Sequence, residues 1–184
     1  MKHVLSLVLC FLFIAGLAQA QGGTIGVFGD TGGAACDIYD STPGLVLVYV
    51  VHVYTPGATG CQFKIDDSAA SMTFLAESVP APYMSIGSSH YGIAIVYGMC
   101  VPAPNLVLTL QYFAQGLSTA CSHIDVVPDP TAVPPGIYVA NCAYPAPALL
   151  NATGGTVMVN PIEDCMCNVP AEDTTWGQIK SLFK

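Results

Sequence analysis

Residues 45–53, Leu-Val-Leu-Val-Tyr-Val-Val-His-Val, are the segment of the chain that decides its fold class. β-Branched and aromatic side chains dominate this run, and Pro43-Gly44 and Pro56-Gly57 bound it with turn signals. Apolar residues occupy both faces of the expected strand. The pattern therefore predicts a central strand that is covered on both sides, with His52 near its end.

Further segments with strand signals lie between turns rich in glycine and proline. Residues 61–65, Cys-Gln-Phe-Lys-Ile, alternate so that Gln62 and Lys64 point outward. The other predicted strands span residues 24–28, 72–77, 91–97, 106–113, 137–140 and 156–159. Eight or nine strands with no clear helix before residue 170 predict an all-β fold, an antiparallel β-sandwich of immunoglobulin-like type. A closed β-barrel is the alternative that the pattern leaves open.

The N-terminus has the pattern of a secretory signal peptide. A short basic start precedes an apolar run from Val4 to Leu17, and Ala18-Gln19-Ala20 fits a cleavage site. The run is shorter than the roughly 20 residues that span a bilayer, and Cys10 lies inside it rather than at its end, where a lipidated cysteine belongs. We therefore predict that residues 1–20 are removed after Ala20, and that the protein is secreted, periplasmic or at the cell surface.

The C-terminus differs from the predicted sandwich domain, residues 21–167. Residues 168–184 contain a linker followed by Thr175 and Gln178 at capping-box spacing. Four side chains form one apolar stripe of the short helix expected there: Trp176, Ile179, Leu182 and Phe183. A helix of about ten residues is not stable alone. We expect this tail to dock on its own domain, or to be recognised by a partner or a secretion system.

Composition and charge exclude several functions. The chain is 53% hydrophobic and 9% charged, has a net charge of −8 and contains no arginine. Nucleic-acid binding requires clustered Lys and Arg, so we exclude it, and no segment after the leader is long and apolar enough to span a membrane. The acidity indicates either simple solubility or a cation site.

Calcium is the cofactor that the acidic residues would favour. Its weak candidate ligands are Asp30, Asp37, Asp40, Asp66 and Asp67. The Asp-x-Asp-x-Asp-Gly loop is missing, and Asp66-Asp67-Ser68 is more simply a turn. We therefore predict no cofactor, with calcium as the minor alternative.

The cysteine count predicts a disulfide-bonded protein. Removal of Cys10 with the leader leaves seven candidates, Cys36, Cys61, Cys100, Cys121, Cys142, Cys165 and Cys167. An exported chain forms disulfides by default, and an odd count leaves one thiol after three bridges. Spacing suggests pairing Cys36 with Cys61, Cys100 with Cys121, and Cys142 with Cys165 or Cys167. A zinc site at Cys165-x-Cys167 lacks two further ligands.

No catalytic pattern stands out. Ser88-Ser89-His90 places a hydroxyl beside an imidazole, but neighbours in a strand point to opposite faces, and there is no Gly-x-Ser-x-Gly elbow. The histidines lack metal-ligand spacing. Tyrosines that could stack on sugar rings are Tyr49, Tyr54, Tyr83, Tyr91, Tyr97, Tyr112, Tyr138 and Tyr144.

Two segments carry a resemblance to known proteins. Residues 45–65, with Gly57-Ala58-Thr59-Gly60-Cys61-Gln62-Phe63-Lys64-Ile65, and residues 106–113 resemble strands of cohesin-like extracellular β-sandwiches. The tail, Thr174-Thr175-Trp176-Gly177-Gln178-Ile179-Lys180-Ser181-Leu182-Phe183, is similar to the ends of uncharacterised exported bacterial proteins with a T-W-G-x-I/V-K-x-L-Y/F pattern. The first resemblance implies a cohesin-like sandwich, and the second group has no established activity to carry over to this chain.

These observations predict an exported, non-enzymatic β-sandwich with a structural or protein-binding role. Its expected partner is another surface protein or a polysaccharide. A carbohydrate-binding module is the first alternative, and an exposed aromatic row on one sheet face would favour it. A small secreted hydrolase is the second, and a cleft that joins a histidine, a carboxylate and a hydroxyl would favour that.

Overall fold

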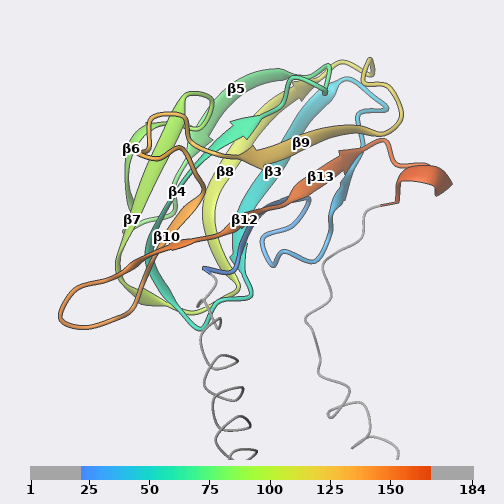
Figure 1. The fold of residues 1–184 in the computed structure, drawn as a ribbon. Coiled ribbons are helices and arrows are strands. Elements are labelled where there is room, and N and C mark those ends of the chain that lie inside the picture. The colour runs from blue at the N-terminus through green and yellow to red at the C-terminus, as the bar shows by residue number, and fades with distance from the viewer. Residues whose placement is uncertain (1–21, 167–184) are drawn as a thin grey trace, which may run out of the picture.

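A computed structural model describes residues 22–166, so the predicted leader and tail lie outside the described residues. The described chain forms two layers of β-sheet (Figure 1). The first layer, sheet A, has the strand order β12 (Thr153–Gly154), β1 (Thr24–Phe28), β3 (Gly44–Val53), β8 (Asn105–Ala114) and β5 (Thr73–Ser78).

The second layer, sheet B, contains the remaining strands. Its main order is β11 (Leu149–Asn151), β10 (Tyr138–Asn141), β4 (Ala58–Asp66), β9 (Ser122–Val127), β13 (Thr156–Val159) and β2 (Asp37–Ile38). Strand β7 (Gly92–Val101) also pairs with β4, and β6 (Met84–Ser88) pairs with β7. A short 3₁₀ helix, η1 (Glu163–Cys165), follows β13. Both sheets are open, so the predicted sandwich is confirmed and the closed barrel is not formed.

The core lies between the two sheets and follows the two-residue period of the strands. Val48 and Val50 of β3 and Leu108 and Leu110 of β8 point into it and are fully buried. From sheet B, Phe63 of β4 packs among them, together with Ile65, Ile93, Ile95, Ile124 and Val126. The inward Phe63 and Ile65 agree with the alternation predicted for residues 61–65, in which Gln62 and Lys64 point outward.

The opposite face of β3 is covered at one end only. Val51 and Val53 are buried in a second cluster with Phe28 and Cys36. The covering segment is the loop of residues 29–36, where Gly33 lies against both valines. Asp30 shapes this loop, because its carboxylate accepts hydrogen bonds from the backbone N–H groups of residues 32, 34 and 35. At the other end of the strand, Leu45 is 61% exposed, so the expectation of cover on both sides is wrong for that half.

Eight of the predicted strands are present, with Gln62 and Lys64 outward as expected. Five strands were not predicted, namely β2, β6, β9, β11 and β12. Strands β2, β6, β11 and β12 are short or rich in small and polar residues, so their local patterns are weak. Strand β9 alternates between buried and outward residues, and this signal was missed. Across residues 22–166, helical structure is confined to η1, and no helix there is long and apolar enough to cross a bilayer.

Candidate functional site

The outer surface of sheet B presents apolar side chains over five adjacent strands, and we call it the sheet B face. Its first row runs Met84, Val96, Gly60, Ala140 and Leu149, in register from β6 through β7, β4 and β10 to β11. The second row runs Ile86, Ala94, Gln62, Tyr138 and Asn151. Neither row contains a charged residue. In the first row the central positions are the small residues Gly60 and Ala140, between Met84 and Leu149 at the two ends of the row.

The large apolar side chains at the edges of this face have no cover. Met84 is 68% exposed, Ile86 79% and Leu149 71%. Monomeric soluble proteins rarely leave contiguous apolar patches bare, and such patches commonly mark interaction sites. β6 is also an edge strand, and it lacks the lysine or proline that normally protects an edge from pairing with other chains.

A hollow of about 510 Å³ lies beside the second row. Ile86 and Tyr91 form part of its wall, with Gln62, Asp129 and Thr131. Asp129 is buried, and its carboxylate accepts hydrogen bonds from Gln62 Nε2 at 2.7 Å and from the Thr131 N–H at 2.7 Å. Because these groups satisfy one another, the wall of the hollow presents an apolar rather than an ionic surface.

Electrostatics keep this buried carboxylate ionised. Burial raises the pKa of Asp129, but hydrogen bonds from Gln62 and Thr131 outweigh that effect, so the pKa lies below its ordinary value. Gly92 permits the close approach, because a Cβ at this position would collide with the Asp129 carboxylate. Its φ of +122° is also a conformation that L side chains rarely adopt.

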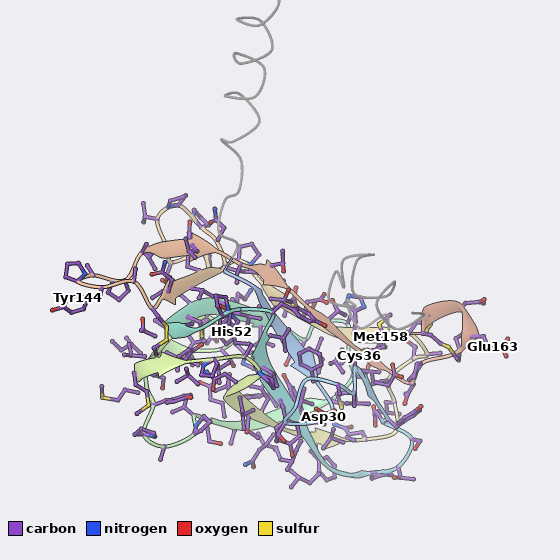
Figure 2. The ribbon with its side chains drawn as sticks, turned by 90° about the horizontal axis from the view of Figure 1, so that it is seen from below. Asp30, Cys36, His52, Tyr144, Met158 and Glu163 are labelled. Atoms are coloured by element: carbon purple, nitrogen blue, oxygen red, sulfur yellow. A yellow bond between two sulfur atoms is a disulfide. The ribbon has the colours of Figure 1, made fainter. Side chains whose placement is uncertain are left out.

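A projecting loop extends the sheet B face beyond β10 and β11. Every side chain from Ala143 to Leu149 is exposed, and Tyr144 lies at the tip with 96% of its surface accessible (Figure 2). Asn141 fastens the base, because its Oδ1 accepts hydrogen bonds from the N–H groups of Ala143 and Ala148. No charged residue occurs between Asp129 and Glu163, so the loop continues the uncharged character of the face.

A disulfide joins the base of this loop to β7. Cys100 at the end of β7 pairs with Cys142 beside Asn141. The bridge crosses the start of β4, where Gly57 leaves room for it, since a Cβ there would come within 3.0 Å of both sulfurs. The bond therefore connects two of the strands that form the sheet B face.

The other cysteines also depart from the predicted pairing. Cys121 pairs with Cys165, and Cys61 is a free buried thiol. The proposed Cys36–Cys61 and Cys100–Cys121 pairs, and the pairing of Cys142 with Cys165 or Cys167, are therefore wrong. Cys36 is disulfide-bonded as well. Cys61 is inert in the folded protein, because burial raises the pKa of its thiol to about 12.

The structure brings Ser89, His90 and Asp67 together, contrary to the expectation from the sequence. Ser89 and His90 occupy the turn between β6 and β7 rather than a strand, so both side chains reach one side. Ser89 Oγ lies 3.2 Å from His90 Nδ1, and His90 Nε2 lies 2.8 Å from Asp67 Oδ2. This set contains the hydroxyl, imidazole and carboxylate of a hydrolase.

The surroundings of these three groups suit a structural role instead. Ser89 is fully buried, and its N–H donates to the Glu77 carboxylate at 3.0 Å. A nucleophile needs access to substrate, and a nearby N–H would have to be free to stabilise an oxyanion. The His90 ring packs on Phe74 with centroids 4.3 Å apart. The hydrogen bonds therefore fasten the turn at Asp66–Ser68 to the turn between β6 and β7.

The five candidate calcium ligands are held separately, and Asp37 lies in β2 in register with Met158 of β13. Asp40 accepts hydrogen bonds from the N–H groups of Gly116 and Ser118, and Asp66 accepts one from its own turn at Ser68. Asp30 serves its loop and Asp67 binds His90. Within residues 22–166 no three acidic, histidine or cysteine side chains are arranged to hold a metal ion.

The most exposed tyrosines do not form a row on either sheet. Tyr39 lies in the connection after β2, Tyr91 in the turn between β6 and β7, and Tyr144 at the tip of the projecting loop. Tyr97 and Tyr112 are buried in the core. The arrangement that would favour a carbohydrate-binding module is therefore not found among the described tyrosines. Trp176, Ile179, Leu182 and Phe183 lie outside the described residues.

Sequence reasoning missed most of the sheet B face. It predicted β4 and β7 but not β6 or β11, which supply Met84, Ile86 and Leu149. The signal available in the sequence is a set of large apolar residues in short segments between prolines. Their position beside β4 and β10 depends on strand order, which the local sequence does not encode.

Fold and face together define a mainly antiparallel β-sandwich, with the parallel pairs β1–β12 and β2–β13, that leaves one apolar outer face uncovered. No family model matches the chain, and no curated protein matches it. Solved structures similar to it are cohesin modules. The third ScaB cohesin of R. flavefaciens, solved with a group 1 dockerin, is 15% identical, with 78% of this chain and 97% of that chain covered and a TM-score of 0.45.

Two further cohesins match at a similar level. The sixth cohesin of Acetivibrio cellulolyticus scaffoldin B, in complex with a Cel5 dockerin, is 10% identical, with 77% and 100% coverage and a TM-score of 0.45. The seventh ScaB type I cohesin of Pseudobacteroides cellulosolvens is 10% identical, with 79% and 96% coverage and a TM-score of 0.42. Likeness at this level carries no information on a partner of the present chain.

Proposed function

We propose that this protein is an exported, non-enzymatic binding module that recognises another protein through the sheet B face. The supporting observation is the bare, uncharged surface formed in register by β6, β7, β4, β10 and β11. Burying such a surface is favourable by about 25 cal/mol for each Å² of apolar area. The uncovered side chains of Met84, Ile86 and Leu149 provide that area.

The chemistry of the face specifies the kind of partner. Its two rows lack charge, so the centre of the partner surface is apolar and uncharged. The chain as a whole carries a net charge of −8, so a partner with basic residues around that centre would associate faster and with stronger salt dependence. The fixed Tyr144 loop adds an aromatic side chain, a residue type enriched among the side chains that dominate binding energy.

Export is part of this proposal. The predicted signal peptide at residues 1–20 supports it. The disulfides Cys100–Cys142 and Cys121–Cys165 fit the same compartment, because such bonds persist in oxidising environments. The protein would therefore meet its partner outside the cytosol, at the cell surface or beyond it.

The test uses immobilised mature protein and the exported fraction of the cells that make it. We expect a protein to be captured by the wild type and lost with Ile86→Asp, because a charge would be buried in the interface. The matched control is Leu75→Asp on the outer surface of sheet A, where Leu75 is 52% exposed. Equal capture by both variants would contradict the proposal.

A further inference from the structure

The outer surface of sheet A carries a second bare region, which we call the sheet A patch. It consists of Leu45, Leu47, Leu75 and Phe113, which are between 39% and 61% exposed. Leu45 lies directly opposite Phe113 across β3 and β8. Leu75 lies in an irregularity of β5 beside the same part of β8. The outward side chains around them are Thr73, Thr109 and Gln111, so the patch is uncharged.

This patch continues directly into the covered half of the same surface. Along β3, Val53 and Val51 lie under the loop of residues 29–36, Tyr49 is partly buried, and Leu47 and Leu45 are bare. The chain therefore already folds one of its own segments onto this surface. The exposed fraction of these outward side chains of β3 therefore rises from Val51 toward Leu45, beyond the part of the strand that the loop covers.

Cys36 connects the covered half to another part of the chain. It is buried in the cluster with Val51 and Val53, and it is disulfide-bonded. Cys100, Cys142, Cys121 and Cys165 are paired with one another, and Cys61 is a free thiol. Once Cys10 leaves with the signal peptide, Cys167 is the remaining cysteine that can complete the bond to Cys36.

Chain length allows the segment after Cys167 to reach the sheet A patch. Trp176 lies nine positions after Cys167, and an extended chain spans about 3.3 Å per position, or roughly 30 Å. Leu45 lies six positions before Val51 in β3, which is about 20 Å along the strand. A ten-residue helix is about 15 Å long, which is about three strand spacings across sheet A.

We propose that the C-terminal segment is tied to sheet A by a Cys36–Cys167 disulfide and lays Trp176, Ile179, Leu182 and Phe183 on the sheet A patch. The bond forms when two thiols pass two electrons and two protons to a disulfide oxidant of the export compartment. Docking supplies the apolar contact that a helix this short needs to be stable. The same contact removes the sheet A patch from solvent.

Trp176 is the only tryptophan of the chain, so its fluorescence reports on this segment alone. In the mature full-length protein we expect blue-shifted emission and weak quenching by acrylamide. Leu45→Asp should shift the emission to the red and raise the quenching constant several-fold. The matched control, Ile86→Asp on the sheet B face, should leave both unchanged.

Three results would overturn the proposal. The first is wild-type emission as red, and as strongly quenched, as in the unfolded protein. The second is a Leu45→Asp spectrum equal to wild type while circular dichroism shows both proteins folded. The third is emission that shifts with protein concentration, because that would place the segment on a second copy of the chain.

Mass spectrometry of the unreduced protein tests the covalent part separately. Cyanogen bromide cleavage after Met166 separates Cys165 from Cys167, and we then expect one peptide pair that joins Cys36 to Cys167. The Cys61 thiol should alkylate only after unfolding. An alkylated Cys167 in the native exported protein would contradict the tether. None of these measurements depends on the sheet B face, so the proposed function can fail without affecting them.

Discussion

The two outer surfaces of this sandwich are alike in chemistry and differ in what the chain does with them. Each presents several large apolar side chains and no charge in its bare part. On sheet A, the loop of residues 29–36 and the bonded Cys36 already cover half of the surface. On sheet B, the face spans five strands and ends in an open edge at β6. An apolar surface that adjoins the chain's own covering segments favours intramolecular cover, whereas the other favours a partner.

The largest expected loss of stability comes from removing the Cys100–Cys142 disulfide, which connects two strands of the sheet B face. Replacing Cys100 and Cys142 by alanine opens a loop with a sequence separation of 42 residues, which in the chain-entropy model costs about 4 kcal/mol of stability. Urea unfolding measures this change. Trp176 fluorescence below the unfolding transition should remain that of the wild type, and a large change there would show that the two surfaces are coupled.

Gly92 offers a smaller change at one point of the sheet B face. Gly92→Ala forces a Cβ against the Asp129 carboxylate in a strained backbone conformation, and we expect a loss of about 2 kcal/mol. Gly98→Ala is the control, because Gly98 also has a positive φ but an added Cβ there would meet open space. If thermal unfolding shows equal losses for the two variants, the contact with Asp129 is not tight.

These positions show how much the sequence could predict. The β-branched and aromatic run at residues 45–53 and the alternation at residues 61–65 indicated strands, and the sandwich followed from the number of such segments. The pairing of Cys100 with Cys142 could not be predicted, because it depends on β7 and β10 lying on either side of β4. The same strand order assembles the sheet B face from β6 and β11, whose own sequences give weak signals.

Acid should lower the stability of the protein through His52, a fully buried residue of β3 that belongs to neither outer surface. Burial lowers the pKa of His52 below 6.5, although its hydrogen bond to the Gly22 carbonyl raises it. The unfolded chain then binds a proton at a higher pH than the folded chain does. Stability is therefore full above about pH 6.5 and falls below it, by up to about 1.4 kcal/mol per pH unit.

Urea unfolding at pH 7.5 and pH 5.5 measures that loss. His123→Asn should keep it, because His123 is on the surface with its side chain 45% exposed. A nuclear magnetic resonance titration of the His52 ring identifies the group directly. Titration of His52 at or above pH 6.5 in the folded protein would remove the explanation.

Ile86→Asp should give the smallest change in stability, although it should give the largest change in partner binding. Ile86→Asp alters a side chain that is 79% exposed, so unfolding free energy should change by no more than about 0.5 kcal/mol. Thermal unfolding checks this. A loss of several kcal/mol would mean that Ile86 supports the fold, and the capture experiment would then require Met84→Asp in its place.

Site-specific photo-crosslinking tests the central claim, that the sheet B face is the surface for the partner. A photoreactive side chain is placed at position 86 or at position 45 of the full chain, and the protein is illuminated in the exported compartment of its own cells. We expect one discrete adduct with another protein from position 86, and from position 45 only an internal crosslink to the C-terminal segment. An intermolecular adduct from position 45 and none from position 86 would contradict the account.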